Sequence, residues 1–205
     1  MKARVWRKKK LMNIRERYKI PAGAKIILYV GNISRNKNQL QMVDAFDLLP
    51  RSLADNTYVL FCGEENDASI SLPERISKSA FASHLIMCGG VPRQNMPDYY
   101  KSANAVVLLS FAEGFGLSLA EGMYFGLPSM TFSDLSAFQD LYDPESMVAI
   151  TSRKDADVAS ALQTLLSTTW NRDVIRKLSN KFSSSYMADS YIAVYHKVLS
   201  QRTSL

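Results

Sequence analysis

Two glutamates eight residues apart are the side chains of this sequence whose spacing points most directly to chemistry. Glu113 and Glu121 flank a glycine turn in the run Glu-Gly-Phe-Gly-Leu-Ser-Leu-Ala-Glu. Glycines let a backbone turn sharply and bring free N–H groups close to a ligand, and the dipole of a following helix adds partial positive charge. Such a turn suits a diphosphate, and a carboxylate on the helix can reach a sugar hydroxyl. The pattern therefore predicts a site for a nucleotide sugar.

The same run also fits two other roles. Ser118 and Glu121 have the spacing of a capping box, in which both side chains bond backbone N–H groups of their own helix. A dinucleotide fingerprint fits less well, because the third motif glycine or alanine is replaced by Leu119. The ligand-binding and capping-box interpretations both stay open at this point.

The elements around the motif must bring the glutamates to one place. Residues 106–109 are a short apolar run typical of a strand buried on both faces, and residues 117–125 have a helical pattern. Ligands of open α/β sheets bind at the carboxyl ends of the strands. We therefore expect Glu113 at that edge and Glu121 on the helix that follows it.

Short apolar runs alternate with helical patterns from residue 21 to residue 150. Strands are predicted at residues 26–30, 58–62, 85–88, 106–109, 129–132 and 147–150. This order predicts an α/β fold, with a Rossmann-like parallel sheet of about six strands and helices on both faces. Later apolar stripes predict a helical C-terminal tail; the last stripe contains Tyr191, Ile192, Tyr195, Val198 and Leu199.

The basic residues gather at the amino terminus. Residues 1–19 carry a net charge of +8 and the remainder carries −2, out of +6 for the 205 residues. Each cation near an anionic membrane contributes about 1 kcal/mol, so peripheral membrane contact stays open. No aromatic interleaving or second basic face follows, which argues against nucleic acid as a partner.

Several sequence features predict a cytoplasmic protein. No apolar run approaches the roughly 20 residues that span a bilayer, and the basic start leads into Asn13, Arg15 and Glu16 instead of an apolar signal segment. Cys62 and Cys88 each close a strand-like run, which is typical of buried, reduced thiols without a metal.

With strand, glycine turn and paired glutamates together, the sequence resembles the carboxyl-terminal, donor-binding domain of the retaining glycosyltransferases of family 4, also called group 1. The resemblance spans roughly residues 16–200 and rests first on the E-x7-E motif at Glu113 and Glu121, followed by Gly-Leu-Pro at 126–128. A second match is residues 29–38, similar to the glycine loop of the family with its phosphate-binding lysine. A third, residues 88–91 and 96–103, resembles the loop that faces the nucleotide base.

The resemblance implies a role for each matched residue. Glu121 would hold the ribose hydroxyls, Glu113 would be the catalytic residue against the donor sugar, and Lys37 would neutralise the diphosphate as its charge grows on departure. The other implied donor-binding residues are Gly31, Arg35, Val91, Gly114, Phe115, Gly116 and Leu117. No metal and no cofactor are implied.

Three departures from the family pattern matter. Asn32 follows the loop glycine where the family usually has an arginine, so Arg35 either supplies the second cation or faces solvent. Ser118 replaces a common proline of the motif. The chain also resembles one half of a GT-B fold, so an acceptor domain must come from a longer chain or from a separate polypeptide.

We therefore expect residues 1–20 to be a basic linker or interdomain segment, residues 21–183 a nucleotide-sugar domain and residues 184–205 a C-terminal helix. The predicted function is transfer of a hexose, with retention and without a metal, from a nucleoside diphosphate sugar to a glycan or lipid-linked acceptor. The alternative is a non-catalytic or degenerate partner subunit of a split glycosyltransferase. A flavodoxin-like or dehydrogenase module is less favoured.

Overall fold

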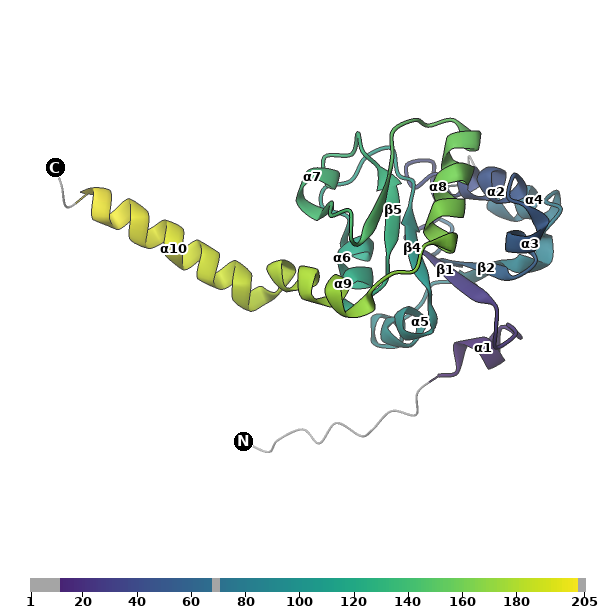
Figure 1. Cartoon of the computed structure of the whole chain (residues 1–205), viewed down its shortest axis with the longest axis horizontal. Coiled ribbons are helices and arrows are strands. Elements are labelled where there is room, and N and C mark those ends of the chain that lie inside the picture. Colours follow the sequence, from purple (N-terminus) through teal and green to yellow (C-terminus); the bar gives the residue numbers. More distant parts are fainter. Residues whose placement is uncertain (1–11, 68–70, 203–205) are drawn as a thin grey trace.

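A computed structural model describes residues 12–67 and 71–202 of the chain (Figure 1). Its centre is a six-stranded parallel sheet with the strand order β3-β2-β1-β4-β5-β6. The strands are β1 (Lys25–Val30), β2 (Thr57–Cys62), β3 (Leu85–Gly89), β4 (Ala105–Leu108), β5 (Ser129–Phe132) and β6 (Met147–Ile150). Each predicted apolar run forms a strand, to within one residue at either end. The predicted Rossmann-like α/β fold is confirmed.

The helices lie on both sides of this sheet (Figure 1). They are α1 (Ile14–Arg17), α2 (Gln39–Asp47), α3 (Arg51–Ala54), α4 (Leu72–Ser77), α5 (Met96–Ser102), α6 (Leu117–Tyr124), α7 (Phe138–Leu141), α8 (Asp155–Ser167), α9 (Arg172–Leu178) and α10 (Ser184–Arg202). Short 3-10 turns are η1 (Ala82–His84), η2 (Arg93–Asn95) and η3 (Ser179–Phe182). Helix α2 packs on α8, and α6 packs on β4 and α9.

Burial on both faces explains why the central strands read as unbroken apolar runs. Ile26, Ile27 and Leu28 in β1 are fully buried, as are Val106 and Val107 in β4. A parallel sheet covered by helices on both faces selects such runs instead of alternation. The sheet therefore offers a rigid base whose strand ends carry the loops of interest.

The strand order reverses between β1 and β4. From β1 the chain builds outward through β2 to β3, and from β4 it builds outward through β5 to β6. Loops that follow two such neighbouring strands diverge and leave a crevice, which is where open α/β sheets bind ligands. The loop of Lys37 follows β1 and the loop of Glu113 follows β4.

The C-terminal helix α10 extends away from the sheet and its covering helices (Figure 1). This confirms the predicted helical tail, whereas the apolar stripe of that helix is exposed. The exposed fractions of its five residues lie between 47% and 64%. Within the described residues, no helix combines the length and the apolar character needed to cross a membrane.

The amino-terminal basic segment lies mostly outside the described residues. Residues 1–11 are not described. The short helix α1 begins beyond them and buries Ile14. The predicted boundaries of this segment and of the nucleotide-sugar domain stay predictions.

Candidate functional site

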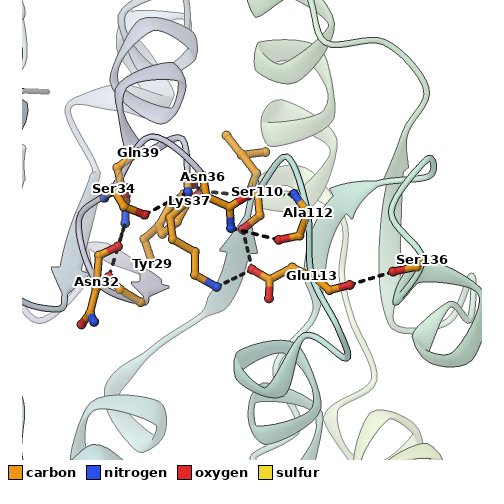
Figure 2. Close-up of polar contacts among 12 residues, drawn as sticks. Tyr29, Asn32, Ser34, Asn36, Lys37, Gln39, Ser110, Ala112, Glu113 and Ser136 are labelled. Atoms are coloured by element: carbon orange, nitrogen blue, oxygen red, sulfur yellow. Dashed lines mark hydrogen bonds and ion pairs between the residues drawn. The ribbon is translucent and has the colours of Figure 1, made fainter. Parts of the chain in front are cut away.

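The side chain of Asn36 joins the loops after β1 and β4. Its amide Nδ2 donates to the carbonyl oxygen of Ala112 (3.0 Å), and its Oδ1 accepts from the N–H of Ala112 (3.1 Å). The backbone carbonyl of Asn36 also accepts from the N–H of Phe111 (2.8 Å). Figure 2 shows this connection between the two loops. The crevice between β1 and β4 is therefore bridged at the position where the predicted site residues lie.

Lys37 and Glu113 form an ion pair at this bridge (Figure 2). Ser110 Oγ donates to Oε1 of Glu113 (2.6 Å), and Ser136 Oγ donates to the Glu113 backbone carbonyl (2.7 Å). The two charged side chains are 25% and 12% exposed. The structure therefore brings together two predicted residues that are 76 positions apart.

Tyr29 supports Lys37 from inside the sheet. Its hydroxyl accepts from the N–H of Leu109 (2.8 Å) and donates to the Lys37 carbonyl oxygen. Burial raises the pKa of Tyr29, so the phenol remains a donor. This fully buried tyrosine fixes the Lys37 backbone relative to β4.

Gly31 has a backbone conformation that favours glycine. Its φ of +148° lies in a region that side chains rarely adopt, and a Cβ there would lie 3.3 Å from Lys37 Cε. The carbonyl of Asn32, next in the chain, accepts from Nε2 of the buried Gln39 (3.0 Å). The backbone of the glycine loop therefore lies close to the aliphatic part of the Lys37 side chain.

The glycine turn after Glu113 opens α6 as predicted, yet without a capping box. Gly116 is the N-cap residue, with a left-handed φ of +75° and no side-chain hydrogen bond. Ser118 lies inside the helix, and Glu121 Oε2 accepts instead from the hydroxyl of Tyr100 (2.7 Å). The capping-box interpretation is therefore wrong, because a glycine that needs its own positive φ takes the N-cap position.

A cavity of about 610 Å³ adjoins this edge of the sheet. Four predicted residues line it, namely Gly31, Val91, Leu117 and Glu121. Its wall also includes Asn32, Gly90 and Met96 from the matched segments, and Gly63, Glu64 and Arg93, which the sequence did not single out. The cavity therefore runs from the glycine loop after β1 to the loop after β3.

Two glycines let the loops around this cavity approach one another. A Cβ on Gly63 would lie 2.1 Å from the Gly31 carbonyl oxygen. A Cβ on Gly90 would lie 2.5 Å from Oε1 of Glu64. The loops after β1 and β2 therefore touch through backbone that has no room for a side chain, and the backbone after β3 lies against the Glu64 side chain.

The remaining predicted residues lie around the cavity instead of within it. Glu113 and Gly114 line a separate cavity of about 330 Å³. Phe115 meets the ring of Phe182 edge-on at 5.5 Å and lines an apolar groove of about 730 Å³ beside α10, as does Leu117. Leu117 therefore borders both the cavity of about 610 Å³ and the groove.

Arg35 does not line the larger cavity. It is exposed, and its backbone N–H donates to Asp67 Oδ2 (3.1 Å). The alternative in which this arginine faces solvent describes the structure better. Elsewhere, both cysteines are free thiols, Cys62 buried and Cys88 half-buried. In the part of the chain that the structure describes, no cluster of three or more His, Cys, Asp or Glu could hold a metal ion.

Comparison with known proteins places these features in a family. The sequence pattern of the family described as Glycosyl transferases group 1 matches residues 12–182. The O-antigen chain mannosyltransferase B of Escherichia coli is 30% identical over 146 residues, which are 70% of this chain and 37% of that protein. The mannosylfructose-phosphate synthase of Agrobacterium fabrum is 29% identical over 112 residues, 52% of this chain and 25% of that protein.

Solved structures with the same fold include a glycosyltransferase from Rickettsia africae, with a TM-score of 0.73 and 18% identity over 90% of this chain and 50% of that one. The lipopolysaccharide outer core galactosyltransferase WaaB has a TM-score of 0.70 and 20% identity, over 85% of this chain and 50% of that one. The chain spans 37% or less of these two sequence relatives and half of each solved chain. The family match covers most of this chain, which therefore belongs to the group 1 glycosyl transferases.

Proposed function

We propose that this chain is the carboxyl-terminal, donor-binding half of a family 4 glycosyltransferase with a GT-B fold. The enzyme transfers a hexose from a nucleoside diphosphate sugar to a glycan or lipid-linked acceptor, with retention of the anomeric configuration and without a metal ion. The enzyme acts in polysaccharide biosynthesis in the cytoplasm and binds peripherally to the inner face of the membrane. The names of the mannosyltransferase and galactosyltransferase relatives support a hexose as the transferred group.

The observation that best supports this proposal is the placement of three charged groups at the switch point. Lys37 and Glu113 meet across the β1 and β4 loops, and Glu121 faces the adjacent cavity of about 610 Å³. A cation, a carboxylate for the sugar and a carboxylate for the ribose are thus arranged along one edge. Cavities of 300–1,000 Å³ are typical of sites for small ligands.

Each group has a task in the proposed reaction. Lys37 and the backbone N–H groups of residues 114–117 receive the charge that grows on the leaving diphosphate, where fixed cations and dipoles lower the barrier most. Glu113, held by Ser110 and Ser136, faces the donor sugar. Glu121 accepts hydrogen bonds from the ribose hydroxyls, and the backbone around Val91 faces the base.

The acceptor domain comes from outside the described fold. The chain spans about half of the solved relatives, so an amino-terminal acceptor domain completes the enzyme, in a longer chain or as a separate polypeptide. A second candidate function is a partner subunit whose donor cleft does not turn over. It is favoured by Asn32 at the position where an arginine is expected and by the solvent-facing Arg35.

Binding of nucleotides by the purified chain tests this proposal. We expect one nucleoside diphosphate from a panel of five bases to raise the melting temperature in the presence of EDTA. The stabilisation is RT ln(1 + [L]/Kd), about 1.4 kcal/mol at ten times Kd. Glu121→Gln, which removes the charge of the proposed ribose-binding carboxylate, should reduce the shift in melting temperature. No shift with any nucleoside diphosphate or nucleotide sugar at millimolar levels would refute the donor site.

A further inference from the structure

Glu121 reaches the cavity from an exposed position on α6, yet one of its carboxylate oxygens is already held. Tyr100 on α5 donates its hydroxyl hydrogen to Oε2 of Glu121 over 2.7 Å. Among the described residues, no other side chain hydrogen-bonds this carboxylate. Oε1 is therefore left for a ligand in the cavity that Glu121 lines.

The phenol that holds Glu121 is itself fixed. Tyr100 is 1% exposed, and its ring stacks on that of Phe125 with centroids 5.2 Å apart and planes 4° from parallel. Burial, and then the hydrogen bond to Glu121, raise the pKa of Tyr100. The hydroxyl therefore stays protonated and points in one direction over the whole physiological pH range.

A free glutamate side chain has three rotatable bonds and loses up to roughly 2 kcal/mol of rotamer entropy when it is immobilised. A hydrogen bond from a rigid buried donor removes part of that entropy before the ligand arrives, which strengthens binding through preorganisation. The advantage exists only for ligands that contact the carboxylate. A nucleotide without ribose hydroxyls gains nothing from it.

We propose that Tyr100 is a positioning residue that aims the Glu121 carboxylate at the 2′ and 3′ hydroxyls of the donor ribose, and so sets the preference of the site for ribonucleotides. This inference rests on the proposed donor site. It assigns a task in ligand selection to a buried hydroxyl on α5, a helix that precedes the E-x7-E motif in sequence.

The experiment compares two tyrosines that are neighbours in the chain. Tyr100→Phe removes the hydroxyl bonded to Glu121. Tyr99→Phe removes one from an equally buried residue of the same helix, whose hydroxyl lies 2.8 Å from that of Tyr18 and is not bonded to Glu121. Calorimetry then gives the affinity of each variant for the preferred nucleoside diphosphate and for its 2′,3′-dideoxy analogue, and thermal melting without ligand checks the fold.

We expect Tyr100→Phe to bind the ribonucleotide roughly threefold to tenfold more weakly and the dideoxy analogue as the native chain does. Tyr99→Phe should leave both affinities unchanged. The inference is overturned if Tyr100→Phe leaves the ribonucleotide affinity unchanged. It is also overturned if the variant lowers the affinities for both ligands equally, because the lost hydroxyl then does not act through the ribose hydroxyls. If the native chain binds no nucleoside diphosphate, the proposed function itself fails and the inference fails with it. Native binding with an unaffected Tyr100→Phe variant refutes only the inference.

Discussion

Lys37 and Glu113 form an ion pair in the structure, so in the proposed site a donor diphosphate would share the ammonium group with a carboxylate. The pair is mostly buried, with side-chain exposures of 25% and 12%. Removing one partner therefore leaves the other charge poorly solvated, and the two possible substitutions act in opposite directions on a bound anion.

Lys37→Met should weaken nucleoside diphosphate binding by about 1.5–3 kcal/mol, the usual contribution of a hydrogen bond to a charged group. Glu113→Gln should strengthen it, because the substitution removes a negative charge near the diphosphate and frees Lys37. Isothermal titration calorimetry measures both. Arg35→Met serves as the control cation and should have little effect, since Arg35 is exposed and outside the cavity lining. Equal losses for Lys37→Met and Arg35→Met would indicate general electrostatic attraction instead of a specific site.

At this scale the sequence pointed to the charged residues and missed both their pairing and the side chains that hold them. Glu113, Glu121 and Lys37 belong to recognisable motifs. Tyr100 acts on a residue 21 positions away and Asn36 on one 76 positions away. Such contacts depend on which loops become neighbours in the fold, and spacing along the chain carries no signal for them.

Among the elements, helix α6 shows how one small residue sets the position of the motif. Gly122 lies on the face of α6 that packs on β4, and a Cβ there would lie 2.6 Å from Cγ2 of Val106. Val106 is fully buried in the sheet, so it has no room to move away. The close approach brings Glu121, the preceding residue, to the cavity.

Gly122→Ala should lower the free energy of unfolding. A glycine inside a helix is about 1 kcal/mol less favourable than alanine, but overpacking a core costs typically 1–3 kcal/mol, and the clash with a β-branched neighbour places this site at the upper end. Urea unfolding measures the difference. Gly23→Ala is the control, because a Cβ at Gly23 meets nothing within 4 Å. A more stable Gly122→Ala variant would mean that helix propensity outweighs the contact.

Elements of strong period were predicted well, whereas four of the short helices were not. The six strands follow apolar runs that a doubly covered sheet requires. Helices α1 and α3 span four residues each, α4 spans six and α9 spans seven, lengths too short for a helical period to stand out.

For the whole molecule, the main charged groups of the proposed donor site, Lys37, Glu113 and Glu121, follow two neighbouring strands of one sheet. Holding two reactants in a productive geometry can supply roughly 7–11 kcal/mol of barrier lowering. By our proposal, a chain that spans about half of its solved relatives supplies the donor side of that geometry, and another domain supplies the acceptor side.

The purified chain should therefore bind a nucleotide sugar without transferring the hexose. Mass spectrometry of products from a panel of glycan and lipid-linked acceptors measures transfer. Adding a polypeptide that carries an acceptor domain should restore it, and Glu113→Ala in the restored enzyme should lower kcat more than it raises KM. Robust transfer by the 205-residue chain alone would contradict the division of labour proposed for the two halves.

The side chain of Asn36 holds together the two loops that follow β1 and β4. Its amide copies the hydrogen bonds of a neighbouring strand by donating to and accepting from the same residue, Ala112 (Figure 2). These hydrogen bonds hold the two loops together in the absence of a ligand. A donor bound at the proposed site would find these two loops already joined, so the entropy of ordering them is lost during folding and not on binding.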